Sequence, residues 1–383
     1  LQTDNKELID QTITTFYKAP KSFTGEDMVE ISVHGSDAVI KKIFEIFSTK
    51  KNIRLAKPGE FTRRAFENNK LDLTQVEAIS DIVNSQTEMQ RKQAISHLSG
   101  NFFKSSKKIF ENLKKILANI EAFIDFSEEE LPDSLMNEIK EQIENIITKI
   151  NTTLKGSKTG ISIRDGFIVG ILGKPNTGKS SFVNYVSDKD VSIVTNEPGT
   201  TRDLIESFVD VHGYPVKFVD SAGIRNSTNI VEKIGVEKAF LLSKDSNINI
   251  VFVDKAEDID EFKKTKNSIF VKSKQDISKK PFQDKGYFHI SSKTGFGIQN
   301  LLLLIKDIID KKTPYESSYI SRERHAECLG LVVDYLKNSQ NDKNIDLFAE
   351  DIRLALKNLS NLFGNVDIED ILDIVFSDFC IGK

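Results

Sequence analysis

The sequence has little cysteine: Cys328 and Cys380 are the only two among 383 residues. Two cysteines exclude a disulfide framework and are typical of a reducing compartment, which predicts a cytoplasmic location. No run of 18 apolar residues exists, so no segment is expected to span a membrane. Charge of either sign is not in large excess, because 53 Lys and Arg stand against 57 Asp and Glu. This balance argues against a protein that coats nucleic acid by charge alone.

A glycine-rich segment, GKPNTGKS at residues 173–180, fits the pattern G-x-x-x-x-G-K-[ST]. The apolar run at residues 167–172 before it predicts a buried parallel strand, and residues 181–186 after it predict a helix. Strand, loop and helix together would aim backbone N–H groups at a phosphate. We expect Lys179 to reach the β- and γ-phosphates of a nucleotide and Ser180 to ligate Mg²⁺. The predicted nucleotide-binding residues of this loop are Asn176, Thr177, Gly178, Lys179, Ser180 and Ser181.

Two segments further along complete a magnesium and γ-phosphate site. PVKFVDSAG at residues 215–223 predicts a strand that ends in D-x-x-G. Asp220 is expected to hold Mg²⁺ through water, and the N–H of Gly223 to contact the γ-phosphate. In EPGTTRD, residues 197–203, Thr200 or Thr201 would close over Mg²⁺, with Thr201 as the predicted metal ligand.

A guanine-reading segment follows two more predicted strands, at residues 248–254 and 268–272. Residues 273–276, SKQD, differ by one residue from the motif N-K-x-D. Asp276 would accept the N1 and N2 protons of guanine, and Lys274 would lie along the base. Adenine offers no such donor pair, so the carboxylate would reject it. The loop with Ser291, Ser292 and Lys293 would meet guanine O6 through its backbone, which completes the predicted GTPase domain.

Two substitutions distinguish this chain from other GTPases. Ser273 replaces the usual Asn and shortens the side chain that ties base to loop, which affects affinity more than specificity. Ile224 follows D-x-x-G where many signalling GTPases carry a water-orienting Gln, and it cannot orient water. A monovalent cation against the phosphates could supply the charge of an arginine finger. The K⁺ ligands predicted for it are Asn176, Thr195, Glu197 and Thr200.

The segments around these motifs resemble the TrmE (MnmE) family of tRNA-modifying GTPases. The resemblance rests on Asn176, on GTTRD, on DSAGIR and on IVEKIGVEKA at residues 230–239. It rests further on SFTGEDMVEISVHG, RLAKPGEFTRRAFENNKLDL and the terminal FCIGK, and it covers essentially the whole chain. The family normally has a further N-terminal segment of about half a domain, so the resemblance implies a partial N-terminal domain here.

The resemblance implies an activity and its partners. A K⁺-stimulated, Mg²⁺-dependent GTP hydrolase would help to modify C5 of the wobble uridine of certain tRNAs. Its further cofactor would be a tetrahydrofolate derivative as one-carbon donor, bound by Glu30, Lys70 and Lys383. A flavin-dependent partner protein would join a homodimer of this chain in a heterotetramer. Glu232 stands at the family's proposed catalytic glutamate, and Cys380 at a cysteine proposed to take part in uridine modification. Without the resemblance, both read as ordinary helix residues.

The predicted architecture is multidomain, α/β and α. Residues 1–70 mix short strands, at residues 29–35 and 52–56, with a helix at residues 38–48, as a partial α+β tetrahydrofolate-binding-like domain. Apolar residues at helical spacing predict long helices in residues 71–163 and again in residues 314–383. A P-loop GTPase domain, residues 164–313, is inserted between these two parts of one elongated helical domain.

Two other functions stay open on the residues alone. A regulatory GTP switch of the ribosome-assembly type would use the same nucleotide motifs without modification chemistry. Such proteins often carry a G-x-x-G RNA-binding loop after the GTPase unit, and no G-x-x-G pattern occurs after residue 313 of this sequence. A helical stalk that assembles on membranes is the third alternative, and no basic amphipathic anchor supports it.

Overall fold

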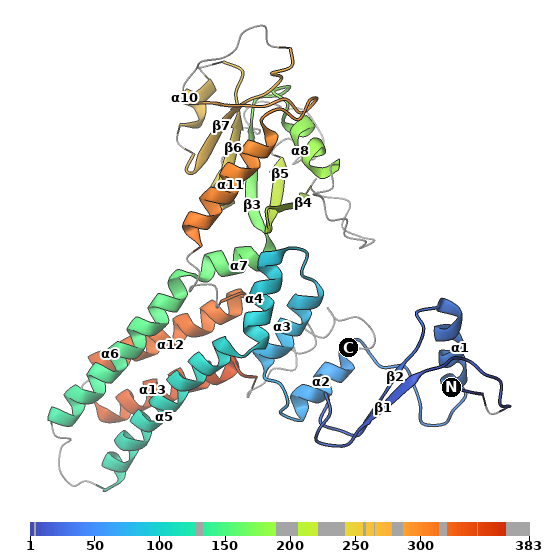
Figure 1. The fold of residues 1–383 in the computed structure, drawn as a ribbon. Coiled ribbons are helices and arrows are strands. Elements are labelled where there is room, and N and C mark those ends of the chain that lie inside the picture. Colours follow the sequence, from blue (N-terminus) through green and yellow to red (C-terminus); the bar gives the residue numbers. More distant parts are fainter. Residues whose placement is uncertain are drawn as a thin grey trace, which may run out of the picture.

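The computed structural model has three regions along the chain: an N-terminal unit, a body of helices and a unit built on a β-sheet (Figure 1). It describes residues 1–3, 5–126, 133–188, 206–220, 242–255, 258–263, 265–277, 286–313, 320–342 and 344–364. Among these residues, no helix is both long enough and apolar enough to cross a membrane.

The N-terminal unit is a two-stranded antiparallel sheet with two helices. Its elements are β1 (Ile13–Tyr17), β2 (Met28–Ser32), α1 (Asp37–Ser48) and α2 (Glu60–Glu67). The structure confirms the strand and the helix predicted around β2 and α1. The prediction of a strand at residues 52–56 was wrong, and β1 was not predicted. Arg54 pairs with Glu60 at 2.7 Å, which fastens that segment to the start of α2 instead of to a neighbouring strand.

The helical body contains the long amphipathic helices that the sequence predicts. Its elements are α3 (Leu73–Val83), α4 (Glu88–Leu98), α5 (Asn101–Phe126), α6 (Asp133–Lys155), α7 (Ser157–Asp165), α12 (Glu323–Asn341) and α13 (Ile345–Asn361). One apolar core joins side chains of α5 and α6, from before the sheet unit, to side chains of α12 and α13, from after it. The two stretches therefore fold as one body although more than 150 residues separate them in sequence.

The third unit is a six-stranded sheet with helices packed on it. The strands are β3 (Phe167–Gly173), β4 (Glu206–Val211), β5 (Tyr214–Asp220), β6 (Ile248–Phe252), β7 (Ser268–Lys272) and β8 (Phe288–His289). Their order is β4-β5-β3-β6-β7-β8, and only β4 runs antiparallel to its neighbour. The helices described in this unit are α8 (Lys179–Asp188), α10 (Asp258–Phe262) and α11 (Ile298–Lys312).

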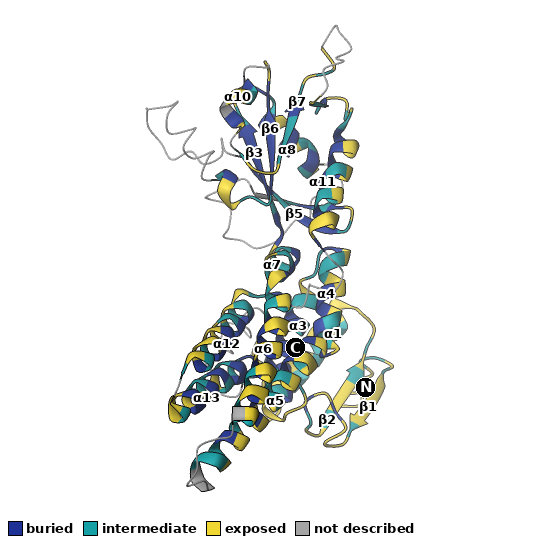
Figure 2. Ribbon diagram, turned by 90° about the vertical axis from the view of Figure 1, so that its left-hand side faces the viewer, coloured by how far each residue is buried: buried dark blue, intermediate teal, exposed yellow. Residues whose placement is uncertain are grey.

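Burial explains why the central strands are continuous apolar runs. All five residues of β6 are buried, and β3 and β5 are buried over most of their length (Figure 2). A parallel sheet covered on both faces requires this pattern. The rings of Phe218 and Phe252 lie 5.6 and 5.7 Å from the ring of Phe182 on α8. These contacts fix α8, and with it the loop that precedes it, on the sheet.

Candidate nucleotide site

The loop at residues 173–180, called the phosphate loop below, connects the carboxyl end of β3 to the first residues of α8. Gly173, Asn176 and Gly178 have φ angles of 134°, 65° and 99°, which glycine and asparagine tolerate best. A Cβ atom at position 178 would lie 2.6 Å from the Ser273 hydroxyl oxygen. Glycine at 178 is therefore required both by backbone conformation and by close packing.

Lys179 is a buried cation aimed back at its own loop. Its Nζ donates hydrogen bonds to the carbonyl oxygens of Gly173 and Lys174, at 2.8 and 2.7 Å. The side chain is 5% exposed, and this burial lowers the pKa of Lys179 while the charge of Asp220 opposes the shift. An ammonium group held on neutral carbonyls gains from a nearby anion, so its chemistry fits a bound phosphate.

Ser180 and Asp220 meet beside the phosphate loop, as the sequence predicts for two magnesium-binding groups. The Ser180 hydroxyl donates to Oδ2 of Asp220 at 3.0 Å, which joins the start of α8 to the end of β5. A hydroxyl and a carboxylate are oxygen donors of the kind that Mg²⁺ takes with water and phosphate. The pair fits that ion. No group of three or more His, Cys, Asp or Glu side chains suited to a metal occurs in the described ranges.

The loop after β7, which the sequence predicts to read guanine, is tied directly to the phosphate loop. The Ser273 hydroxyl donates to the carbonyl oxygen of Thr177 at 2.5 Å, and Nζ of Lys274 donates to the carbonyl of Asn176 at 2.7 Å. These two bonds bring residues almost 100 positions apart into contact. The sequence showed that Ser273 is shorter than Asn, but only the structure shows that it still reaches the other loop.

Asp276 has an exposed carboxylate positioned by the loop after β8. Its Oδ1 accepts a hydrogen bond from the Ser291 hydroxyl at 2.8 Å, and Ser291 is fully buried. The loop between Ser291 and Gly297 is tight, since a Cβ at Gly295 or Gly297 would overlap the Tyr185 hydroxyl or the His289 carbonyl. A carboxylate held in this way can accept two parallel N–H donors from a base edge.

Several predicted site residues lie outside this cluster of contacts or outside the described residues. Ser181 lies in the first turn of α8, and Ser292 and Lys293 lie in the loop after β8; no contact that defines a role is seen for them in the described residues. The residues that lie outside the described ranges are Thr195, Glu197, Thr200, Thr201, Gly223, Ile224, Glu232, Cys380 and Lys383.

The predicted folate residues Glu30 and Lys70 both lie exposed in the N-terminal unit. The Tyr17 hydroxyl donates to Glu30 at 3.3 Å, and the charge of Glu30 raises the pKa of Tyr17. Nζ of Lys70 donates to the carbonyl of Pro20 at 2.9 Å, which fastens the loop between the two strands to the end of α2. No hydrogen bond or ion pair is seen between Glu30 and Lys70 themselves.

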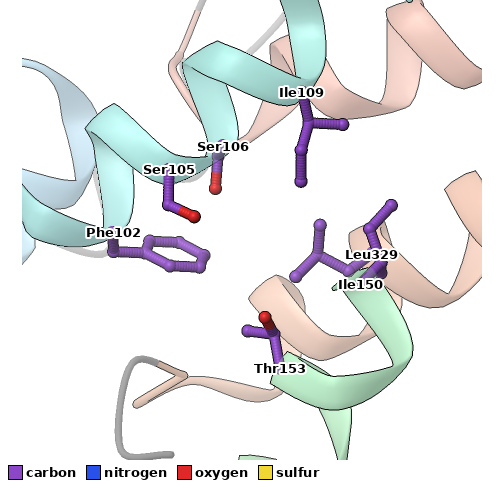
Figure 3. A pocket seen from close by; sticks show the side chains of 7 residues that line it. All are labelled: Phe102, Ser105, Ser106, Ile109, Ile150, Thr153 and Leu329. Atoms are coloured by element: carbon purple, nitrogen blue, oxygen red, sulfur yellow. The ribbon is translucent and has the colours of Figure 1, made fainter. Parts of the chain in front are cut away.

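A small pocket in the helical body differs from the candidate nucleotide site in the chemistry of its lining. It is lined by Ser105 and Ser106 of α5, Thr153 of α6 and four apolar side chains (Figure 3). The Thr153 hydroxyl donates to the carbonyl of Lys149 within its own helix. The lining has no charged group, so it lacks the chemistry that a phosphate or a metal ion requires.

Comparison with known proteins gives matches over nearly the whole chain. Residues 1–70 match the family model described as GTP-binding protein TrmE N-terminus, and residues 73–380 match the MnmE helical domain. A tRNA modification GTPase MnmE of Pelagibacter ubique is 40% identical over 395 residues, covering 99% of this chain and 88% of that protein. The MnmE of Rickettsia prowazekii is 36% identical over 394 residues, with the same coverage.

Among solved structures, the G domain of the T. maritima FeoB iron transporter is similar to part of the chain. The match is 22% identical, covers 39% of this chain and 99% of that domain, and has a TM-score of 0.29.

Proposed function

Because the chain belongs to the MnmE (TrmE) family of tRNA modification GTPases, we propose that it hydrolyses GTP to take part in tRNA modification. The observation that carries the proposal is the bond between Ser273 and Thr177, at 2.5 Å. It places the loop that would read guanine against the loop that would hold phosphates. Base recognition and phosphate binding then occur on one nucleotide.

Different residues of the site are proposed to bind the phosphates, the magnesium ion and the guanine base of GTP. Lys179 would bind the β- and γ-phosphates, Ser180 would ligate Mg²⁺, and Asp220 would hold the ion through water. Asp276 accepts the two guanine protons, and the backbone of residues 291–293 meets O6. Magnesium, where bound, neutralises phosphate charge that develops during hydrolysis.

Hydrolysis itself depends on groups beyond the phosphate loop. We propose that K⁺ binds Asn176, Thr195, Glu197 and Thr200, and that the N–H of Gly223 and the hydroxyl of Thr201 complete the γ-phosphate site. Asn176 is exposed in the middle of the phosphate loop, which supports its proposed role as a K⁺ ligand. Since Ile224 cannot orient water, Glu232 is proposed as the general base.

The substrate of the modification is proposed to be C5 of the wobble uridine of certain tRNAs. A reduced-folate one-carbon unit would bind Glu30, Lys70 and Lys383, a flavin-dependent protein would be the partner, and Cys380 would act on the uridine. This chain would form the homodimer of a cytoplasmic heterotetramer. The proposed domains are residues 1–70 (partial folate-binding-like), 71–163 and 314–383 (helical), and 164–313 (GTPase, inserted between the helical parts).

Mass spectrometry of tRNA nucleosides tests the modification. Cells that lack this protein should lose the modified wobble uridine, and expression of the wild-type chain should restore it. Normal nucleosides in the deletion cells, together with a defect in ribosome assembly, would favour the GTP switch without modification chemistry.

A further inference from the structure

Helix α4 contacts the six-stranded sheet unit (residues 167–312), called the nucleotide unit below, at one end and the helical body at the other. Figure 1 shows it at the top of the body, directly below the sheet. Its buried side chains are Gln93, Ala94 and His97, so two of the three are polar. A helix with a polar buried face gains little stability from apolar burial, so its buried polar side chains are expected to make specific hydrogen bonds.

The first bonds hold α7, the helix that leads into β3. Nε2 of Gln93 donates to the carbonyl oxygen of Gly160 at 2.9 Å, and Nε2 of Gln90 donates to that of Arg164 at 2.8 Å. The Arg164 carbonyl belongs to the last turn of α7, where carbonyls have no partner in their own helix. Gln90 at the same time accepts from the N–H of Thr87 as part of the α4 capping box. One side chain therefore fixes the start of α4 and the end of α7.

The next bond holds the turn between β4 and β5. The N–H of Met89 donates to the carbonyl oxygen of Gly213 at 3.0 Å, and the Met89 side chain packs against the apolar core of the nucleotide unit. His212 and Gly213 form a two-residue turn with φ angles of 50° and 93°, as the pairing of Val211 with Tyr214 requires. The tip of this hairpin thus lies on the first turn of α4.

The Gln90 and Met89 contacts lie at the amino ends of two adjacent strands, β3 and β5, and the Gln93 contact lies one turn earlier in α7. β3 and β5 pair in parallel, so their carboxyl ends lie at the same edge of the sheet. That edge carries the phosphate loop after β3 and Asp220 at the end of β5, which the Ser180 hydroxyl joins. A strand of seven residues is about 20 Å long. α4 therefore holds, about 20 Å away, both strands that carry the phosphate and magnesium groups.

The other end of α4 is fixed in the helical body. The ring of His97 stacks on Phe102 of α5 and His325 of α12, with centroids 5.9 and 6.5 Å apart. Nε2 of Gln75 in α3 donates to the Leu98 carbonyl at 3.0 Å. Displacement of α4 would therefore act on three helices of the body.

We propose that α4 couples the nucleotide unit to the helical body, with Gln93 and Met89 as positioning residues. A shift of β3 relative to β5 would reach α4 through two contacts: α7 with Gln93, and the turn before β5 with Met89. The displacement of α4 would then act on α5 and α12. The inference rests on the proposed function, because it names the route by which GTP hydrolysis would act on tRNA modification.

Hydrogen exchange on the full wild-type chain gives the first test. The Met89 amide, which donates to Gly213, should exchange at least about five-fold faster or slower with GDP and aluminium fluoride than with GDP alone. Equal exchange in the two states would overturn the proposal. This measurement requires only nucleotide binding, so it decides the coupling even if the protein proves not to modify tRNA.

A pair of variants gives the second test. Met89→Ala with Gln93→Ala removes the side-chain contacts, and Arg91→Ala with Lys92→Ala, on the exposed face of the same helix, is the matched control. The first variant should hydrolyse GTP within about two-fold of the wild type yet restore at least ten-fold less modified uridine in deletion cells. The control should match the wild type in both. Wild-type modification by the first variant, or an equal loss of hydrolysis and modification, would overturn the proposal.

Discussion

The hydroxyl of Ser273 donates its only hydrogen to the carbonyl oxygen of Thr177, at 2.5 Å. The bond joins the guanine-reading loop to the phosphate loop, and it leaves Ser273 with no second donor for a nucleotide. An asparagine amide has two N–H donors and could serve both. Compared with the asparagine of the N-K-x-D motif, Ser273 therefore keeps the link between the loops and would give up a contact with a bound nucleotide.

Two variants at this position separate the link from the ligand contact. Ser273→Ala should weaken GDP binding by roughly 2–10-fold, the worth of one net hydrogen bond. Ser273→Asn should tighten GDP binding modestly, since the amide adds a donor. Titration calorimetry measures both, with Ser268→Ala, at the start of the strand β7 that precedes this loop, as a control. Unchanged affinity in both variants would mean that neighbouring groups fully replace the serine.

The carboxylate of Asp276 should set the choice of base. Asp276→Asn replaces an acceptor oxygen with an N–H donor, which can pair with the O2 of xanthine but not with the guanine amino group. We expect the variant to prefer xanthosine diphosphate over GDP, and the wild type to prefer GDP over both XDP and ADP. Competition binding against a fluorescent nucleotide measures the order. Equal affinity of the wild-type protein for ADP and GDP would contradict the assignment.

The sequence predicted the strands and the helix around the phosphate loop better than it predicted the contacts between regions. Strand, loop and helix around Lys179 follow from local residue order, and the apolar runs of β3, β5, β6 and β7 follow from burial on both faces. The apolar residues whose spacing predicted helices in residues 71–163 lie outside α4, because the side chains that α4 buries include Gln93 and His97. Periodicity of apolar residues cannot detect a helix whose buried face makes hydrogen bonds.

Polar contacts between residues far apart in the sequence could not be predicted from the sequence either. Glu77 in α3 accepts hydrogen bonds from Arg324 at 2.7 Å and from His325 at 2.9 Å, across almost 250 residues of sequence. Burial opposes ionisation of Glu77, but the His325 hydrogen bond and the Arg324 charge outweigh it and hold the pKa of Glu77 well below its usual value. Nothing in the local sequence marks this glutamate as buried.

Loss of the Glu77 charge should destabilise the helical body strongly. Glu77→Gln leaves the partly buried Arg324 without its closest counter-charge, and breaking a buried ion pair costs about 3–5 kcal/mol. The matched control is Glu121→Gln on α5, which pairs with Arg353 at 3.1 Å where both side chains are more than 40% exposed. That pair should contribute less than about 1 kcal/mol. Urea unfolding of the two variants gives both values, and equal losses would refute the role of burial.

The same cluster predicts acid sensitivity. Burial lowers the pKa of His325 to about 4, so the folded protein keeps this imidazole neutral while the unfolded chain binds a proton below about pH 6.5. Stability should therefore fall as the pH drops from about 6.5 to about 4, by up to roughly 1.4 kcal/mol per pH unit for this one group. Ionised Glu77 adds a loss below about pH 4.5. His325→Gln keeps a donor for Glu77 and should flatten the upper part of the curve; an unchanged slope would exclude His325 as its source.

Hydrolysis should depend on Glu232 and on the cation. Glu232→Ala should leave GTP binding intact and reduce turnover by roughly 10²–10⁴-fold, the usual contribution of a general base. Wild-type turnover should be much faster in K⁺ than in Na⁺, whose smaller radius suits the proposed ligands less well. Steady-state rates in the two salts measure both effects. If Glu232→Ala turns over GTP at the wild-type rate in saturating K⁺, Glu232 is not the general base. If the wild-type protein hydrolyses GTP at equal rates in K⁺ and Na⁺, the proposal of a potassium site is wrong.

Whether the phosphate loop is required for tRNA modification is decided by wobble-uridine levels in deletion cells that carry single variants. Lys179→Ala removes the buried ammonium group of the phosphate loop, and Lys306→Ala, a half-buried lysine of α11 that pairs with Asp310, is the control. Mass spectrometry of tRNA nucleosides should show the modified uridine restored by the wild type and by Lys306→Ala, and absent with Lys179→Ala at equal protein levels. Full restoration by Lys179→Ala would contradict the claim that GTP bound at this site drives the modification.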